Sequence, residues 1–261
     1  MNQLEAETGV TLFVRSRRGI SLTDAGKSLY EDAKIIIRLS EDAVARARKI
    51  ERPEASCIRI GTSVMRSGKR LLELWSGISA EHPGLKVHIV PFDDSFPNYL
   101  NTVQNFGKDI DVIAGIYPSG LWGNACNALK LGDIPICCAA SRLHPLARKE
   151  RLDIQDFYGQ RLMVVERGNT SHMDAVRDEL EKYPEITIMD TNNYDVSVFN
   201  ECESAGSLML TGDNWVDVHP MLVTIPVDWD FTVPYGIIYA KEPSEIVLSF
   251  LRAIQNRNNT P

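Results

Sequence analysis

Two short segments of this 261-residue chain combine hydroxyl, amide and guanidinium side chains in a way that suits binding of a small ligand. Each segment directly follows a short apolar run, at 58–60 and at 162–165, and each precedes a helix-like pattern. In open α/β sheets, ligands bind beyond the carboxyl ends of the strands, and helix N-termini attract anions. We therefore expect two loops that face each other across a cleft. The side chains are Thr62, Ser63 and Arg66 in the first loop and Asn169, Thr170 and Ser171 in the second.

A simpler interpretation stays open for the first loop, because Thr62 or Ser63 would serve equally well as an ordinary helix N-cap. Asp93, Asp94 and the Ile116–Ser119 loop are weaker candidates on the same argument, and ordinary turns explain each of them better. The arginine and the hydroxyl groups favour an anionic metabolite as the ligand.

The sequence contains no pattern typical of catalysis or metal binding. Gly61 and Gly68-Lys69 resemble a phosphate-binding loop, but six residues separate the glycines instead of four, and an arginine follows the lysine. The five histidines lack metal-binding spacing, and no G-x-S-x-G sequence occurs. We therefore expect no cofactor, no metal and no enzyme activity. An enzyme on the same fold is the alternative, which a turnover screen would reveal.

A basic cluster near the N-terminus suits contact with DNA. Arg15, Arg17 and Arg18 lie between the apolar segments 12–13 and 20–22, a pattern typical of a small hairpin with a basic tip. Arginines on a tight turn fit DNA phosphates or the minor groove. A solvated basic turn is an equally good interpretation of the same residues.

Charge is distributed unevenly along the chain. Residues 1–56 contain ten Lys and Arg against nine Asp and Glu, whereas residues 57–261 contain eighteen against twenty-six. A surface that binds nucleic acid needs clustered positive charge. Only the N-terminal part is therefore expected to contact DNA.

The composition, 44% hydrophobic and 24% charged, is that of a globular protein. No apolar run approaches the roughly 20 residues that span a bilayer, and the polar, acidic start does not resemble a signal peptide. Five cysteines without a C-x-x-C pair indicate a reducing cytosol. Cys137 and Cys138 lie in an apolar run and are expected in the core.

One long helix is expected from Thr23, a plausible N-cap, to about Arg52, where Pro53 ends it. Apolar and small residues recur along it at alternating steps of four and three, which is the spacing of a helix-pairing seam. We interpret this seam as the contact with a second subunit, while a surface helix that packs on its own domain stays the alternative. The seam consists of Leu29, Ala33, Ile36, Ser40, Ala43, Ala47 and Ile50.

After a polar linker at 51–56, short apolar runs alternate with amphipathic segments of helix length. This alternation favours parallel sheets with helices on their faces, and nine strands suit two α/β lobes better than one. Helices are expected at 66–80, at 171–183 with a capping pair of Ser171 and Asp174, and at 245–255. The strands are expected at 58–60, 85–92, 110–116, 134–140, 162–165, 185–189, 207–210, 221–225 and 235–240.

The N-terminal sequence NQLEAETGVTLFVRSRRGISLTDAGKSLYEDAKII resembles the LysR-type transcriptional regulators. The spacing L-F-x-R-x-x-R-G-I-x-L-T-x-A-G is similar to the wing and the start of the linker helix in that family. Further along the chain, IRIGTSV, HPGLKVHIV, DIDVIAGI and the HPLA at His144–Ala147 resemble segments of the family's effector domain.

This resemblance implies a two-lobed effector domain of the type II periplasmic-binding-protein kind, with a small metabolite held between the lobes. Effector contacts would fall on the two loops already described and on Ile116, and subunits would pair through the linker helix as homodimers or homotetramers. The implied segments are 1–22 for the end of a winged helix-turn-helix, 23–52 for the linker helix, 53–56 for a hinge, 57–138 with 241–256 for the first lobe, and 139–240 for the second.

Members of the family begin about thirty residues earlier, with the front of a helix-turn-helix whose recognition helix contacts the bases. The resemblance therefore implies a chain truncated within that motif, and no base-reading residue is assigned. The function expected is ligand-responsive DNA-binding control of transcription in the cytoplasm. The alternative is a truncated member that binds ligand, or pairs with full-length relatives, without specific DNA binding.

Overall fold

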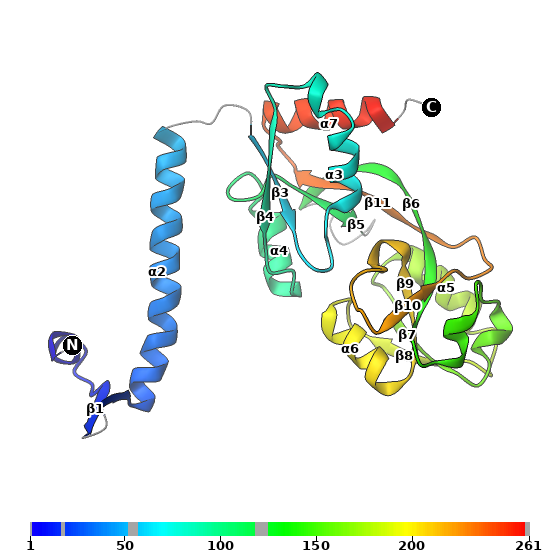
Figure 1. Cartoon of the computed structure of the whole chain (residues 1–261), viewed down its shortest axis with the longest axis horizontal. Helices are drawn as coiled ribbons and strands as arrows, with labels where there is room; N and C mark the ends of the chain where they lie inside the picture. The colour runs from blue at the N-terminus through cyan, green and yellow to red at the C-terminus, as the bar shows by residue number, and fades with distance from the viewer. Residues whose placement is uncertain (1, 17–18, 52–56, 118–124, 259–261) are drawn as a thin grey trace. The chain divides into compact units, whose positions relative to one another are not determined.

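The computed structural model describes residues 2–16, 19–51, 57–117 and 125–258. The chain divides into two compact units, Met1–Ala55 and Ser56–Pro261 (Figure 1), which are considered separately. None of the described helices has an apolar stretch long enough to cross a membrane.

The first unit contains a short helix, a two-stranded hairpin and a long helix. Glu5 ties the first helix to the hairpin, because its carboxylate accepts hydrogen bonds from the backbone N–H groups of Leu12 (2.7 Å) and Phe13 (3.0 Å). The side chain of Thr23 accepts from the N–H of Gly26 at 2.9 Å and so begins the long helix, as the sequence predicts. The elements are α1 (Asn2–Thr8), β1 (Phe13–Ser16), β2 (Gly19–Leu22) and α2 (Asp24–Glu51).

Helix α2 carries large apolar side chains that its own unit leaves exposed. Ile36 is 63% and Ile37 58% exposed, whereas Leu29 and Ala33 are half-buried. Ala43 is exposed, and the side chains of Ala47 and Ile50 lie outside the description. Further apolar residues, Tyr30, Ile35, Leu39 and Val44, are also exposed, so the apolar surface is broader than the expected seam. Pairing through this helix stays a prediction.

In the hairpin, Arg15 pairs its backbone with Ile20. Arg17 and Arg18, the other two arginines expected to contact DNA, lie outside the described residues. Contact between these arginines and DNA stays a prediction.

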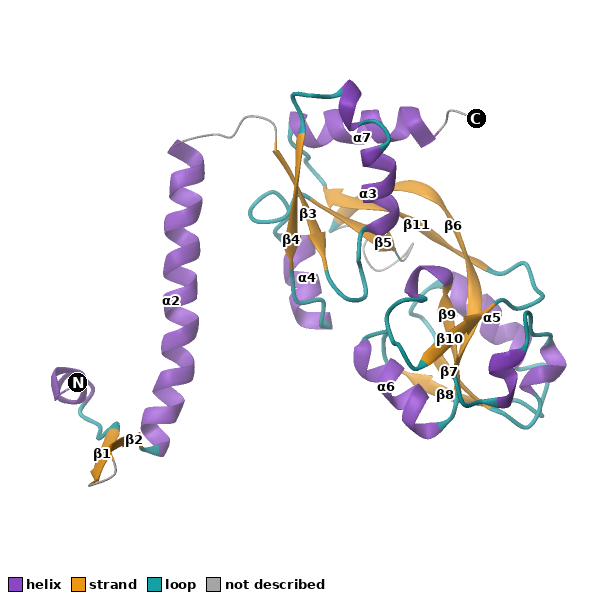
Figure 2. Cartoon of the chain, in the orientation of Figure 1, coloured by secondary structure: helices purple, strands orange, loops and turns teal. Residues whose placement is uncertain are grey.

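The second unit is built on nine strands in the order β4-β3-β5-β11-β6-β9-β7-β8, with β10 paired to β6. Helices cover the strands of both ends of this order (Figure 2). We call the β4-β3-β5 end lobe I and the β9-β7-β8 end lobe II. The strands are β3 (Cys57–Thr62), β4 (Lys86–Pro91), β5 (Val112–Ile116), β6 (Cys126–Ser141), β7 (Arg161–Val165), β8 (Thr187–Thr191), β9 (Leu208–Gly212), β10 (Leu222–Ile225) and β11 (Thr232–Ala240).

The sheet is mixed, so the expectation of parallel sheets is only partly correct. β3 lies parallel to β4 and β5, and β7 lies parallel to β8 and β9. In contrast, β6, β10 and β11 pair antiparallel to their neighbours. The reason lies in the connections: α5 and α6 provide the long crossovers that parallel pairing needs, whereas β9, β10 and β11 follow one another without an α-helix between them.

Two long strands, β6 and β11, join the lobes. β6 begins at Cys126, eight residues before the expected strand, because alternating half-buried and exposed residues precede its apolar run. Residues 235–239 of β11 pair with β5 in lobe I. The expected changes of lobe at 138 and 240 stay a prediction. A bulge lies at Gly236, where a Cβ atom would sit 2.2 Å from the carbonyl oxygen of Leu129.

Buried apolar side chains hold the helices on the sheet. In lobe I, Trp75 of α3 and Phe250 of α7 meet with ring centroids 5.2 Å apart. Cys137 and Cys138 are 4% and 0% exposed, as expected of core residues. The α-helices are α3 (Lys69–Ser76), α4 (Phe96–Gln104), α5 (Ser171–Leu180), α6 (Val196–Ala205) and α7 (Glu245–Asn258), and the 3-10 turns are η1 (Ser79–Glu81), η2 (Pro145–Arg148), η3 (Ile154–Phe157) and η4 (Asp213–Trp215).

Two helices, α4 and α6, were not expected from the sequence. Both are short and rich in Asn, Ser or Thr, residues that favour turns over helix interiors. The signal that could have located α6 is Asp195, whose carboxylate accepts hydrogen bonds from the N–H groups of Ser197 and Val198 and so caps the helix.

Candidate functional site

A cleft of about 540 Å³ lies between the turn after β3 and the turn after β9. We call these the β3 turn (residues 63–68) and the β9 turn (residues 213–218). Its volume is in the range typical of small-molecule sites. The start of α3, β5 and β11 complete the lining. The lining residues are Ser63, Val64, Met65, Arg66, Ser67, Gly68, Lys69, Arg70, Glu73, Ala114, Gly115, Asp213, Asn214, Val216, Asp217, Val218 and Tyr235.

Hydrogen bonds within the β3 turn fix its shape. The N–H of Ser63 donates to the carbonyl of Arg66 at 3.0 Å, and the Ser63 hydroxyl accepts from the N–H of Arg66, also at 3.0 Å. Gly68 then adopts a left-handed conformation (φ +67°), which favours glycine, immediately before α3 begins at Lys69. These hydrogen bonds therefore fix the backbone from which the side chains of the turn extend.

Arg66 is held between an acid and an aromatic ring. Its guanidinium lies 3.5 Å from the carboxylate of Asp94 and 3.9 Å above the ring of Tyr99. Burial raises the pKa of Tyr99, and the positive charge of Arg66 opposes that effect. The Ser63 hydroxyl also donates to Asp94. Asp94, a weak candidate in the sequence, thus positions both Ser63 and Arg66.

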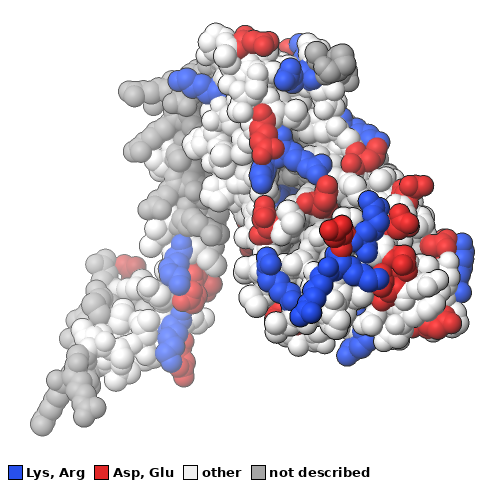
Figure 3. All heavy atoms as spheres, turned by 45° about the vertical axis from the view of Figure 1, so that its right-hand side comes forward, with Lys and Arg blue, Asp and Glu red and all other residues white. Residues whose placement is uncertain are grey.

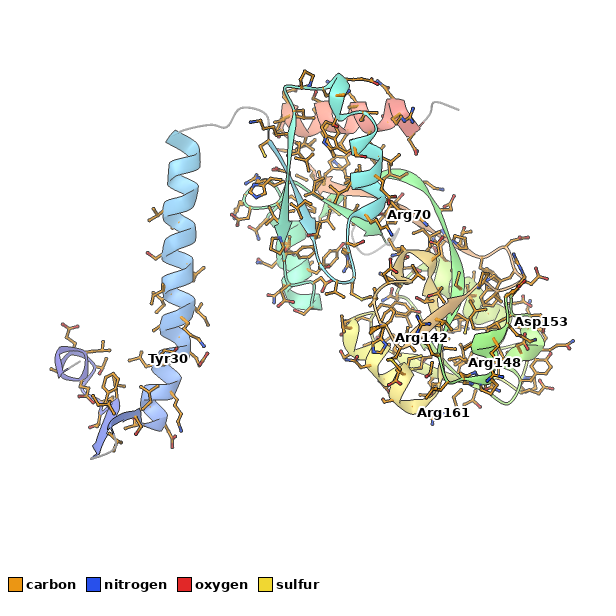
Figure 4. All side chains as sticks on the ribbon, viewed as in Figure 1. Tyr30, Arg70, Arg142, Arg148, Asp153 and Arg161 are labelled. Carbon is orange, nitrogen blue, oxygen red and sulfur yellow. The ribbon has the colours of Figure 1, made fainter. Side chains whose placement is uncertain are left out.

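Three polar contacts cross the cleft from the β3 turn and α3 to the β9 turn. The indole Nε1 of Trp215 donates to the carbonyl of Met65 at 2.8 Å. Arg70, labelled on α3 in Figure 4, donates to both carboxylate oxygens of Asp213, at 2.8 and 2.9 Å. Lys69 lies 3.6 Å from the carboxylate of Asp217. These contacts tie the two lobes together at the cleft.

Met65 adds an apolar contact between the lobes. Its side chain is only 3% exposed, although it belongs to a turn of lobe I. It packs within a cluster otherwise built from lobe II and from β6, which includes Met163, Phe199 and Met209. The apolar contact of Met65 and the polar contacts together hold the β3 turn against lobe II.

Two buried polar atoms of the cleft lining lack a hydrogen-bond partner among the described residues. They are the Nε donor of Arg66 and the Oδ1 acceptor of Asn214. Buried polar groups in proteins are almost always satisfied, by protein, water or ligand. Both atoms are themselves buried, and Asn214 Oδ1 lies against Gly212, where a Cβ would come within 2.4 Å of it.

The family model of the LysR substrate binding domain matches residues 51–258. The chain belongs to this family. The match contains the whole cleft, including both turns and all the strands of the mixed sheet.

Curated relatives of this chain are transcriptional regulators. It is 36% identical over 91 residues to the HTH-type transcriptional regulator BudR of Klebsiella aerogenes, a match that covers 34% of this chain and 64% of BudR. It is 43% identical over 155 residues to the HTH-type transcriptional regulator TcbR of Pseudomonas sp. strain P51, covering 51% of each chain. The chain thus spans less than two thirds of either relative in these matches.

The fold is that of the LysR family. The crystal structure of CbnR, a LysR family transcriptional regulator, matches 100% of this chain and 88% of its own with a TM-score of 0.59 at 17% identity. The expected two-lobed fold of the periplasmic-binding-protein type is therefore confirmed.

Of the residues expected to contact an effector in this LysR domain, Ser63 and Arg66 line the cleft. Thr62 is half-buried at the end of β3, and its methyl group lies under Gly68, where a Cβ would meet it at 3.3 Å. Ile116 ends β5 and is near Gly212, where a Cβ would lie 3.5 Å from the isoleucine side chain. Neither Thr62 nor Ile116 is part of the lining, so their contact with an effector stays a prediction.

The second expected loop, at 169–171, forms the beginning of helix α5. The Thr170 hydroxyl accepts from the N–H of Met173 at 3.1 Å and caps α5. The expected capping residue Ser171 is therefore wrong by one position, since Ser171 is already the first residue of the helix. The Asp174 carboxylate accepts instead from the N–H of Gly168, at 3.1 Å. Asn169, Thr170 and Ser171 are not among the residues that line the cleft, and their role in binding stays a prediction.

Sequence reasoning missed the β9 turn and Tyr235. The signal for the turn was present, because Gly212-Asp-Asn-Trp215 follows a buried apolar strand and carries polar side chains, the criterion that selected the other two loops. Tyr235 was counted only as a strand residue. Burial raises its pKa to about 12, with the neighbouring Arg70 lowering it and Glu73 raising it.

Proposed function

We propose that residues 57–258 bind a small-molecule effector in the cleft between the β3 and β9 turns. The observation that carries this proposal is a cleft of ligand size, about 540 Å³, lined by polar and charged side chains of both turns. Membership of the LysR substrate binding domain family supports the same role. The arrangement favours binding over catalysis, because its charged groups pair with one another rather than activate a nucleophile.

Binding would act on the contacts that cross the cleft. The Arg70–Asp213 and Lys69–Asp217 pairs are well exposed, and exposed ion pairs contribute only about 0.2–1 kcal/mol each. A ligand shifts a conformational equilibrium by its difference in affinity for the two states. A tenfold difference, about 1.4 kcal/mol, is enough to offset one such pair.

We further propose that the chain acts as a ligand-responsive transcriptional regulator in the cytoplasm, as a homodimer or homotetramer. The names of its relatives support this role, and the exposed apolar side chains of α2 support pairing. The hairpin with Arg15, Arg17 and Arg18 would contact DNA. The alternative, a protein that binds ligand or pairs with relatives without specific DNA binding, is supported by the same surface of α2.

The effector site is tested by thermal unfolding of the full chain against a library of small metabolites. At least one compound should raise the unfolding midpoint, because a ligand that binds only the folded state stabilises it. Asn214→Ala should lower the affinity for that compound about 2–10-fold, through the loss of one hydrogen bond. Asn200→Ala, on the exposed surface of α6, is the matched control. If the two variants weakened binding equally, the effector would not bind in the cleft.

The regulatory role is tested by fluorescence anisotropy against DNA from upstream of the gene and against scrambled DNA, at two salt concentrations. Specific binding should exceed non-specific binding by about 10³ or more and respond to the effector. Weak binding of equal strength to both DNAs, lost at higher salt, would instead favour the alternative.

A further inference from the structure

A second cavity, of about 480 Å³, lies beside the cleft and is bounded by α3, α7 and the paired strands β6 and β11. We call it the side cavity. Three residues, Arg70, Glu73 and Tyr235, line both the cleft and the side cavity, so their side chains form a wall shared by the two spaces. Each space has the volume of a small-molecule site. The remaining lining residues of the side cavity are Leu74, Gly77, Leu131, Gly132 and Arg257.

Apolar groups provide most of the lining of the side cavity. Leu74 and Leu131 pack against the main apolar cluster of the second unit, but both are only half-buried. Part of each leucine therefore remains uncovered in the cavity that it lines. The ring of Tyr235 adds further apolar surface, and Gly132 contributes no side chain. Covering such surface with an apolar chain is favourable, because it removes the surface from water.

The charged groups around the side cavity balance one another. Glu73 and Arg257 carry opposite charges and are both exposed, and Arg70 already donates to the carboxylate of Asp213. Lys and Arg are likewise interspersed with Asp and Glu over the face of the molecule shown in Figure 3. The lining therefore presents no net charge for a ligand to match. Its apolar surface decides which chemical group fits.

Arg70 is the part of the shared wall that is held most weakly. Its guanidinium lies 5.6 Å from the ring centroid of Tyr235 and pairs with Asp213. The side chains of this pair are 44% and 40% exposed, and exposed ion pairs contribute little to stability. Rotation of the long Arg70 side chain away from Asp213 therefore costs little free energy. Such a rotation would join the cleft to the side cavity.

We propose that the side cavity belongs to the effector site and takes the apolar chain of an elongated ligand, whose polar end lies in the cleft. Arg70 turns aside where the chain crosses the shared wall. This inference rests on the proposed effector site and specifies its ligand class, which is an amphiphile rather than a compact polar molecule. It adds an apolar chain to the anionic metabolite that the sequence favours.

Gly132 offers a way to fill the side cavity without altering the cleft. It is the cross-strand partner of Tyr235, so a side chain at this position would point to the same face of the sheet as the tyrosine ring. A Cβ atom here would meet no atom of the described residues within 4 Å, and Gly132 is not among the residues that line the cleft. Gly84→Leu is the matched control, because Gly84 is exposed and its Cβ would also meet nothing within 4 Å.

The test measures how affinity depends on chain length. The probes are linear carboxylates, primary amines and primary amides of two to eight carbons, so that the polar end is anionic, cationic or neutral. Isothermal titration calorimetry of the full chain gives each affinity. In at least one series, affinity should rise about three- to fourfold for each methylene that enters the side cavity.

The variants should then remove this rise selectively. In Gly132→Leu, affinity should no longer depend on chain length, whereas Gly84→Leu should behave as the wild type does. Gly132→Ala adds a single carbon atom and should reduce the rise partially, which keeps the test valid if the leucine variant does not fold. A rise that persists in both Gly132 variants would overturn the proposal, as would affinities that do not increase with length in any series.

Two further outcomes separate this inference from the effector site itself. If Gly132→Leu abolishes the rise while Asn214→Ala leaves the affinity for every probe unchanged, the probes occupy the side cavity alone, and the proposal fails. A compound from the metabolite library whose affinity falls in Asn214→Ala but not in Gly132→Leu would leave the effector site intact and overturn its extension. If neither the probes nor the library bind, both proposals fail.

Discussion

The β3 turn and the turn after β7 share residue types but differ in their roles in the structure. Both follow a strand in a parallel set, carry hydroxyl side chains and lead into a helix. The β3 turn reaches across the cleft, where Met65 packs in lobe II and accepts a hydrogen bond from Trp215. The hydrogen bond of the turn after β7 stays within lobe II, where Thr170 caps α5. The same residue types thus serve a cleft in one case and a helix in the other.

The order of the strands explains the difference. In lobe II, β9 lies next to β6, the strand that passes between the lobes, and β7 lies one position farther away. The turn after β9 is therefore the one nearest lobe I, although β7 comes first in the sequence. A polar turn after a strand marks a possible binding loop, but only the order of strands tells which two loops meet.

The largest expected effect concerns the anchor of the β3 turn. Met65→Ala should lower the free energy of unfolding by about 2–4 kcal/mol, because it leaves a cavity in a packed apolar cluster. Chemical denaturation of the two proteins measures this difference. Its neighbour Val64, 61% exposed, provides the control, since Val64→Ala should change stability by less than about 0.5 kcal/mol. Equal effects would mean that Met65 does not anchor the turn.

The turn after β7 should show a smaller, local effect. Thr170→Ala removes the cap of α5 and should cost about 1 kcal/mol of stability, measured by denaturation, whereas Thr170→Ser should retain most of it. Effector affinity should change little in either variant. A large loss of affinity in Thr170→Ser would mean that this turn does contact the effector.

The contact between Arg70 and Asp213 should be weaker still. A double-mutant cycle with Arg70→Ala and Asp213→Ala should give a coupling of about 0.2–1 kcal/mol that shrinks as salt is added, because both side chains are more than a third exposed. A coupling of several kcal/mol that salt does not change would show a strong ion pair that holds the lobes together, instead of a weak exposed one.

Cys137, which pairs with Thr211 just before the β9 turn, reports on access to this region. Burial raises its pKa to about 11, with Asp213 raising it further. Since the thiolate is the reactive form, alkylation at pH 8 should be slow and should accelerate about tenfold per pH unit up to pH 10. Residue-resolved mass spectrometry follows the reaction. Fast alkylation at pH 8 would indicate that β6 and β9 separate readily.

Much of the fold was predictable from sequence because local patterns determine it. The apolar runs located all nine strands, and Thr23 correctly began the long helix. The antiparallel pairing of β6 and β11 was not predictable in this way, because pairing depends on partners distant in sequence. The short helices α4 and α6 were missed because their composition resembles that of turns.

The candidate site was only half predictable for the same physical reason. Ser63 and Arg66 were identified from a local pattern, a strand followed by polar residues and a helix. The turn with Asn214 carries the same local signal, but that the β9 turn and Tyr235 of β11 meet the β3 turn depends on the strand order, which leaves no local signature. The charge balance also depends on pairs between distant residues, such as Arg70 and Asp213.

The central claim, that an effector binds between the β3 and β9 turns, is tested most directly by residue-resolved hydrogen exchange. The full chain is compared with and without the probe that gives the largest rise in unfolding midpoint. Slower exchange should appear in residues 63–70 and 213–218, with little change in 166–171. Protection of 166–171 without protection of 213–218 would contradict the account.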